Sequence, residues 1–108
     1  MTEVYVDFGY CNNLPVYLTV SYPGSSNSNY SWVPLDKIAH IEILNGNELI
    51  ISLVNNDLVK ISNYKKGSKK FYLNGIEMEF YPFCMDIIGN VQSLKVFQLG
   101  IGCFNPVN

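Results

Sequence analysis

The sequence has no arginine, a single histidine and only three cysteines among its 108 residues. Without arginine, the chain lacks the side chain that reads guanine and grips phosphate in a bidentate way, which disfavours sequence-specific DNA binding. The lone histidine, His40, has no second histidine or Cys-x-x-Cys pair near it that would complete a zinc site. We therefore expect neither a metal nor a cofactor.

Long apolar runs and a secretory signal are also missing. The longest apolar segments are only as long as a strand, so we expect no membrane-spanning segment. The N-terminal MTEVYVDFGY has neither the basic region nor the apolar core of a signal peptide. In such a chain Cys11, Cys84 and Cys103 are expected to be buried, reduced thiols. These features together predict a cytoplasmic protein.

Charge of either sign is scarce. Charged residues make up 15% of the chain against 48% hydrophobic residues, and the net charge is −2. A chain with so weak an overall field has no general attraction for nucleic acid or for an anionic membrane. Its length and composition fit one globular domain that spans residues 1–108.

What the chain does have is alternation of apolar and polar residues with a period of two. The pattern runs through residues 3–8 and 15–22, which we therefore predict to be strands. The stretch SYPGSSNSNYS at 21–31 is rich in Gly, Pro, Ser and Asn and predicts a long loop. A short turn is expected at 35–37.

Two consecutive hairpins are predicted between residues 38 and 62 by three-residue loops, Asn45-Gly46-Asn47 and Asn55-Asn56-Asp57. The first pairs Ile43 with Leu49, and the second pairs Ile51 with Ile61. Both registers place the same apolar residues on one face, which favours them, because a slip by one residue would turn every side chain over. That face comprises Ala39, Ile41, Ile43, Leu49, Ile51, Leu53, Val59 and Ile61.

The opposite face of these strands carries four large apolar residues where a water-exposed sheet would have polar ones: Leu44, Ile50, Val54 and Leu58. At about 25 cal/mol per Å² their burial is worth a few kcal/mol. We expect a second layer of the chain, or a second copy in a homodimer, to cover them.

The clearest local signal is the Asn74-Gly75 pair, which is typical of a two-residue type I′ hairpin. This turn pairs Phe71 with Met78 and Tyr72 with Glu77. It gathers Phe71, Leu73, Ile76, Met78 and Phe80 on one face. A short helical piece at 82–88 is predicted to end at Gly89-Asn90, and a last strand to run from 92 to 100.

The fold class predicted from these segments is all-β, a small antiparallel barrel or two-sheet sandwich of about eight strands with at most one short helix. The run VPLDKIAHIEI, at 33–43, resembles the strand–turn–strand opening of LytTR-type DNA-binding domains and, equally, of small bacterial pleckstrin-homology-like domains. The resemblance covers about 11 residues, and LytTR domains are usually basic, unlike this chain. It assigns no family.

No catalytic residue is predicted. His40 and Glu42 share a strand face, and Glu77 and Glu79 share another, but no nucleophile motif accompanies either pair. We therefore expect a binding protein rather than an enzyme.

Binding to another protein, in the manner of an accessory or phage-type inhibitor that occludes its partner, is the function favoured. The loop between Lys60 and Lys70 gathers most of the positive charge, which would steer an acidic partner or a second copy. The predicted contact residues are Lys65, Lys66, Lys69, Lys70, Tyr64, Tyr72, Leu44, Ile50, Val54, Leu58, Tyr30 and Trp32.

Two alternatives use the same residues in other ways. Tyr5, Tyr17 and Tyr72 fall on the polar faces of their strands, and exposed aromatic rings can stack on sugars or other ligands. The Lys60–Lys70 loop could instead follow a single-stranded nucleic acid. Nucleic acid is disfavoured by the acidic total and the small number of lysines.

Overall fold

The computed structural model describes residues 2–22, 30–65 and 67–100. This part of the chain forms strands, one short 3₁₀ turn and one helix. Their order is β1 (Thr2–Cys11), β2 (Leu14–Ser21), β3 (Tyr30–Pro34), η1 (Leu35–Lys37), β4 (Ile38–Leu44), β5 (Glu48–Leu53), β6 (Leu58–Ser62), β7 (Lys69–Leu73), β8 (Ile76–Met78) and α1 (Phe80–Gly100).

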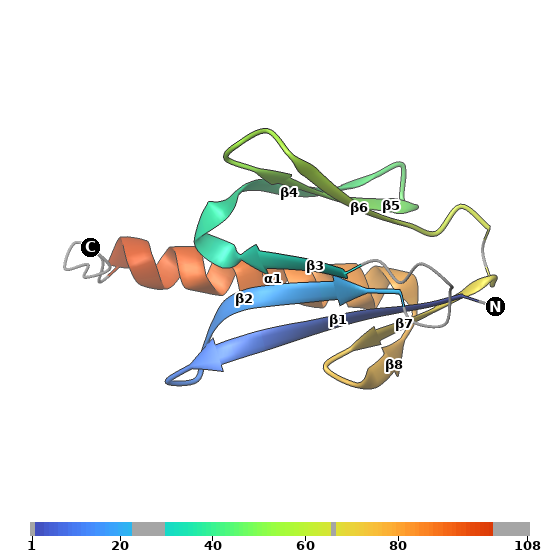
Figure 1. Ribbon diagram of the computed structural model, residues 1–108, viewed down its shortest axis with the longest axis horizontal. Coiled ribbons are helices and arrows are strands. Elements are labelled where there is room, and N and C mark those ends of the chain that lie inside the picture. Colours follow the sequence, from blue (N-terminus) through green and yellow to red (C-terminus); the bar gives the residue numbers. More distant parts are fainter. Residues whose placement is uncertain (1, 23–29, 66, 101–108) are drawn as a thin grey trace.

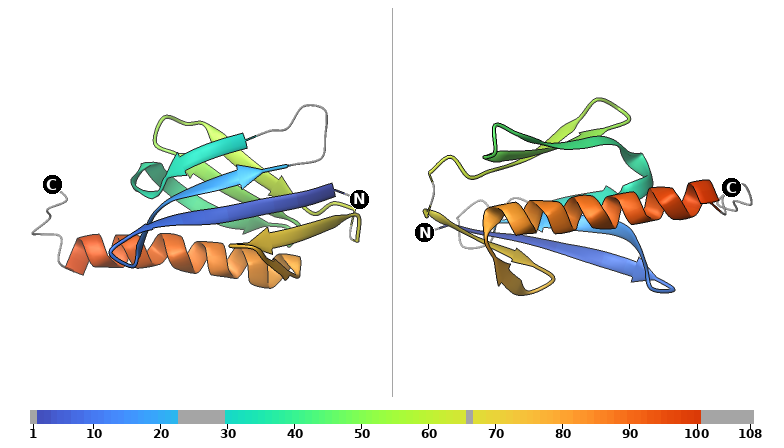
Figure 2. Two further views of the ribbon diagram at one scale, coloured as in Figure 1. Left: turned by 60° about the horizontal axis from the view of Figure 1, so that its bottom comes forward. Right: turned by 180° about the vertical axis from the view of Figure 1, so that it is seen from behind.

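The strands form two separate sheets that are not closed into a barrel. One has five strands in the order β3-β2-β1-β7-β8, and the other has three in the order β4-β5-β6. Figure 1 shows the sheets as two layers that diverge from each other. Helix α1 lies along the open side between them, as the view from behind in Figure 2 shows. The predicted β-rich fold is confirmed.

The core lies where the inner faces of the two sheets meet the helix. Strand residues that alternate along the chain point inward and are fully buried, among them Val4, Val6, Leu18 and Val20 from the larger sheet and Leu49, Ile51 and Ile61 from the smaller one. The helix adds Phe83 and Ile87 to the same cluster. Alternation along the strands therefore leaves two outer faces, one on each sheet, outside this core.

The Asn74-Gly75 hairpin is confirmed in the predicted register, with Phe71 opposite Met78 and Tyr72 opposite Glu77. Both turn residues have positive φ, 50° at Asn74 and 83° at Gly75, as a type I′ turn requires. Asn74 also joins the turn to β1, because its side-chain Oδ1 accepts the N–H of Phe8 at 2.9 Å. Ile76, predicted on the buried face, is exposed at the tip of the hairpin.

The prediction of a purely antiparallel fold is wrong at one place. Strands β1 and β7 pair in parallel, with Tyr5 opposite Tyr72. The chain between them first builds the smaller sheet, so the two strands meet after a long excursion rather than through a hairpin. No local signal in the sequence marks such a pairing.

The β4-β5 hairpin is confirmed, with Ile43 opposite Leu49. In the β5-β6 hairpin, Ile51 pairs with Val59 rather than with Ile61, so the predicted register is wrong by two residues. Because a shift of two keeps every side chain on its own face, the predicted inner face survives. One member is wrong: the irregularity between Ile38 and His40 turns Ile38 inward and leaves Ala39 exposed.

The largest error concerns the C-terminal segment. Residues 80–100 form one 21-residue helix, not a short helical piece followed by a strand. The buried residues recur with helical spacing: Phe80, Phe83, Cys84, Ile87, Val91 and Leu94. The predicted stop at Gly89-Asn90 does not occur, since both residues lie within α1, where the Asn90 side-chain amide donates to the Asp86 carbonyl at 2.9 Å. A second difference is strand β3, since the sequence pattern predicts no strand at Tyr30–Pro34.

Two cysteines of the described chain differ in environment. Cys84 is buried, as predicted, and this burial raises the pKa of its thiol to about 12. The prediction is wrong for Cys11, which is exposed at the end of β1. Cys103 lies outside the described residues, as do Lys66 and most of the predicted 21–31 loop.

Candidate functional site

The outer face of the five-stranded sheet gathers five aromatic side chains from four strands. They are Tyr5 on β1, Tyr17 on β2, Tyr30 and Trp32 on β3, and Tyr72 on β7, and we call this set the aromatic face. Each lies one position away from an inward-facing residue, so the pleat turns it to the outside. Trp32 keeps 56% of its surface exposed and Tyr30 keeps 65%.

Tyr5 and Tyr72 form a stacked pair at the junction of β1 and β7. Their ring centroids are 4.6 Å apart and the ring planes differ by 8°. The Tyr5 hydroxyl donates to Glu3 Oε1 at 2.9 Å, and this hydrogen bond raises the pKa of Tyr5, with burial acting in the same direction. The pair is therefore held in place by the parallel pairing on one side and by a carboxylate on the other.

Tyr17 and Trp32 form the second aromatic contact, with ring centroids 5.6 Å apart. Tyr17 lies directly over Gly9 of the neighbouring strand, since a Cβ built at Gly9 would come within 2.1 Å of its ring. The missing side chain of Gly9 therefore lets the ring lie flat on the sheet, where it contacts Trp32.

Gly9→Ala is expected to lower the free energy of unfolding by about 1–3 kcal/mol, because the added methyl group overlaps the Tyr17 ring and must displace it. Urea denaturation measures the loss. The variant Gly9→Ala/Tyr17→Ala removes the overlap and should recover part of it. A Gly9→Ala protein as stable as the wild type would contradict the placement of Tyr17 over Gly9.

Acidic residues outnumber basic ones among the charged residues of this face. Glu3 and Asp7 alternate with Tyr5 along β1, and Glu77 on β8 pairs with Tyr72. Lys70 on β7 pairs with Glu3 of β1. An acidic surface with exposed rings repels phosphate, so it is poorly suited to the nucleic acid considered above.

The structure separates the lysines that the sequence groups into one loop. Lys70 lies on β7 beside the aromatic face, whereas the Lys69 Nζ donates to the Ser62 carbonyl at 2.8 Å and to its hydroxyl at 3.0 Å. Lys65 is exposed in the turn, and Lys60 lies on the other sheet. Nearby, the exposed Tyr64 donates to the buried carboxylate of Glu48 at 2.8 Å.

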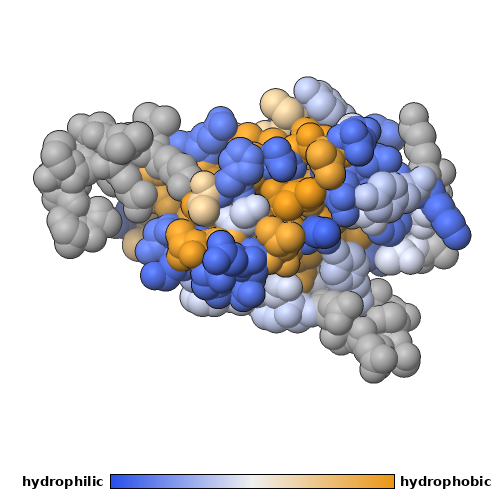
Figure 3. All heavy atoms as spheres, turned by 90° about the horizontal axis from the view of Figure 1, so that it is seen from above, coloured by the Kyte–Doolittle hydropathy of each residue, from blue (hydrophilic) through white to orange (hydrophobic). Residues whose placement is uncertain are grey.

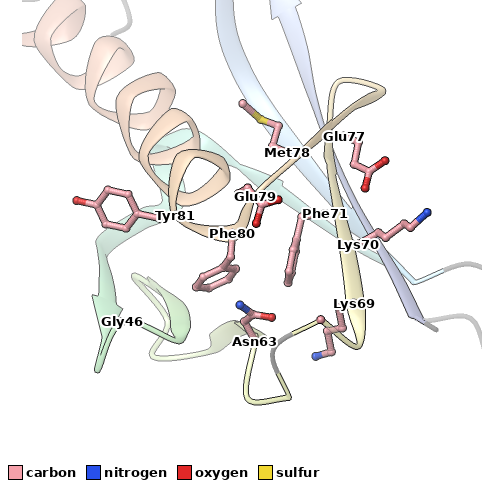
Figure 4. Close-up of a pocket in the computed structure, with 11 residues that line it drawn as sticks. Gly46, Asn63, Lys69, Lys70, Phe71, Glu77, Met78, Glu79, Phe80 and Tyr81 are labelled. Carbon is pink, nitrogen blue, oxygen red and sulfur yellow. The ribbon is translucent and has the colours of Figure 1, made fainter.

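A pocket of about 420 Å³ opens between the start of α1, the β7-β8 hairpin and the two nearby connections (Figure 4). Phe71 and Phe80 form its apolar side, and Lys69 and Asn63 lie across from their rings. Glu77 and Glu79 also line it, but β8 ends at Met78, so the two carboxylates do not share one strand face as predicted.

The second exposed surface is the outer face of the three-stranded sheet. Val54 and Leu58 keep 61% and 53% of their surface exposed, Leu44 is exposed and Ile50 is half-buried. We call these four residues the apolar patch, and Figure 3 shows apolar atoms gathered on this side of the molecule. The prediction that a second layer of the same chain covers them is wrong for the part of the chain that the structure describes.

His40 and Glu42 meet at the edge of this second surface. His40 Nε2 lies 3.4 Å from Glu42 Oε1, and both side chains are at least half exposed. The predicted pairing is present, but it lies on an open strand.

Across residues 2–22, 30–65 and 67–100, no three His, Cys, Asp or Glu side chains gather so as to hold a metal ion. Nor is any helix there long and apolar enough to cross a membrane.

Comparisons of the chain with protein families, with curated proteins and with solved structures found no match. The function therefore has to be argued from the two outer faces. Sequence alternation indicated that Tyr5, Tyr17 and Tyr72 lie on outer faces. It did not indicate that they share one face, because that depends on the parallel pairing of β1 with β7.

Proposed function

We propose that this chain is a protein-binding domain that recognises its partner through the aromatic face. The observation that carries the proposal is the alignment of five aromatic side chains on the outer face of one sheet, with two ring contacts already formed. Tyrosine and tryptophan are the residues most enriched at the energetic centres of protein interfaces, because they bury large areas at a low cost in side-chain entropy.

The shape of the face favours a protein over a small ligand. Small molecules are usually held in concave pockets. Among the described residues, the pocket of about 420 Å³ is lined by none of the five aromatic-face residues, and a second pocket of about 360 Å³ is lined by Tyr30 but by none of the other four. The five rings are spread across four strands instead. A broad sheet surface of this kind suits another folded surface or a segment lying across it.

The charges of the face indicate which groups the partner presents. Rings beside the carboxylates of Glu3, Asp7 and Glu77 attract a planar cation, which stacks on the rings and pairs with the acids. We therefore propose that an arginine-bearing segment of the partner docks here. A domain that covers such a segment occludes it, which is the action of an accessory or inhibitor protein.

Selection of peptides from a random display library, followed by fluorescence titration, tests this function. Trp32 is the single tryptophan of the chain, so its emission reports binding at this face. Selected peptides are expected to carry arginine, to change the emission in a saturable way, and to bind Tyr5→Ala and Tyr72→Ala at least tenfold more weakly, in line with the ~2 kcal/mol of an interface centre.

Tyr81→Ala is the control, because Tyr81 is more exposed than Tyr5 and Tyr72 but lies in the first turn of α1, away from the aromatic face. Peptides that bind Tyr5→Ala and Tyr72→Ala as tightly as the wild type would refute the proposed face. Binding of neutral oligosaccharides in the same titration, with no peptide selected, would replace the protein partner with a sugar.

A further inference from the structure

The outer face of the three-stranded sheet has a charge arrangement that complements itself. Glu42 on β4 pairs with Ile50 on β5, and Ile50 pairs with Lys60 on β6. One row across the sheet therefore runs from an acid at one edge, through an apolar centre, to a base at the other edge. Leu44, Val54 and Leu58 lie around this row and are exposed.

We propose that this face packs against the same face of a second copy, about a two-fold axis that runs along β5. Such a rotation keeps the position along the strands and exchanges the two edges of the sheet. It therefore places Ile50 against Ile50 of the other copy. Glu42 of each copy then faces Lys60 of the other, which gives two charge pairs. A two-fold axis across the strands would instead leave Glu42 opposite Glu42, so the charges select one arrangement.

The proposed contact has the geometry of other packed sheets and the symmetry of other dimers. Two sheets commonly pack face to face with their strands nearly aligned, about 10 Å apart. The contact is isologous, so it closes as a dimer and does not propagate into a fibre. Ile50 lies at its centre, and Leu44 and Leu58 lie on the two edge strands beside the charged pairs. The charged pairs are at the rim, where polar groups of protein interfaces usually lie.

The size of the face predicts a weak dimer. Three strands at roughly 4.8 Å spacing and about six residues of length give a footprint of roughly 300 Å², well under the ~800 Å² per partner of a stable complex. We therefore expect a dimer that dissociates on dilution. In the dimer the two aromatic faces point away from each other, because they lie on the opposite side of each molecule (Figure 1).

Sedimentation equilibrium over a series of concentrations tests the dimer. The wild-type mass is expected to rise from 12.2 kDa toward twice that value with concentration. Glu42→Lys and Lys60→Glu should each hold the protein at the monomer mass. An equimolar mixture of the two variants should restore the dimer, because both edges of one copy then carry lysine and face the glutamates at both edges of the other. Glu77→Lys, on the other sheet, is the control and should leave the sedimentation mass as in the wild type.

Each outcome decides the question. A wild-type mass that stays at 12.2 kDa at millimolar concentration would overturn the proposal. So would a dimer that survives Glu42→Lys, or two charge variants that stay monomeric when mixed. Ile50→Asp adds a further check at the centre of the face, where loss of the dimer with an unchanged circular dichroism spectrum supports the contact. The charge variants remain decisive if that variant fails to fold.

Discussion

Phe71→Ala is expected to lower the free energy of unfolding by about 3–5 kcal/mol, as measured by urea denaturation. Phe71 is almost fully buried on β7, and its ring contacts the rings of Phe80 and Phe83 at 5.0 and 5.1 Å between centroids. It therefore joins the larger sheet to the first turns of α1. Truncation removes both contacts and leaves a cavity between the sheet and the helix.

The matched control for this variant is Ile76→Ala in the same hairpin. Ile76 is 66% exposed at the turn, so its truncation should change stability by no more than about 0.5 kcal/mol. Equal losses for the two variants would mean that the hairpin does not present the Phe71 side to the core, and would contradict the register of β7 with β8.

The second large effect on stability is expected at Gly89, where alanine should stabilise the protein and proline should destabilise it. It lies exposed in the middle of α1, and a Cβ added there meets no atom within 4 Å. Gly89→Ala should therefore stabilise the protein by about 1 kcal/mol through helix propensity alone. Gly89→Pro should destabilise it by about 3 kcal/mol or more, because proline removes a backbone hydrogen bond and clashes with the preceding turn.

Thermal unfolding of the two Gly89 variants distinguishes a continuous helix from a turn. If the helix ended with Gly89 at positive φ, alanine would lower the melting temperature instead of raising it, and proline, whose φ is fixed near −65°, would lower it as well. A melting temperature that falls for Gly89→Ala would therefore contradict the 21-residue helix.

Local patterns predicted much of this fold because neighbouring residues determine them. The type I′ turn at Asn74-Gly75 fixes its own register, and so does the loop at Asn45-Gly46-Asn47. In the β5-β6 turn, by contrast, the Asn55 side chain accepts the N–H of Asp57, and the turn is centred one residue earlier than predicted, which shifts the register by two. The position of such a turn depends on a single side-chain hydrogen bond, which the pattern of apolar residues does not reveal.

The helix and the aromatic face show why the rest was not predicted. The helical spacing of Phe80, Phe83, Cys84, Ile87 and Val91 is visible in the sequence, but Gly89-Asn90 is also a typical helix stop, so the two local signals conflict. The aromatic face depends on β1 lying between β2 and β7, which is a pairing of segments that are far apart in the chain. Only tertiary structure brings Tyr5 onto Tyr72.

The two outer faces give the domain two separate ways to associate. The larger sheet presents aromatic rings with acids, and the smaller sheet presents an apolar centre with an acid and a base at its edges. If both are used, one dimer offers two copies of the aromatic face, and a partner with two arginine-bearing segments would bind more tightly than a single segment does.

The most direct test of the central claim is a map of backbone amide chemical shifts by nuclear magnetic resonance as a selected arginine-bearing peptide is added. Recognition through the aromatic face predicts that the shifted amides fall on β1, β2, β3 and β7, and that Tyr72→Ala reduces those shifts at equal peptide concentration. Shifts confined to β4, β5 and β6, or to the turn around Lys65, would contradict the claim that the aromatic face is the binding surface.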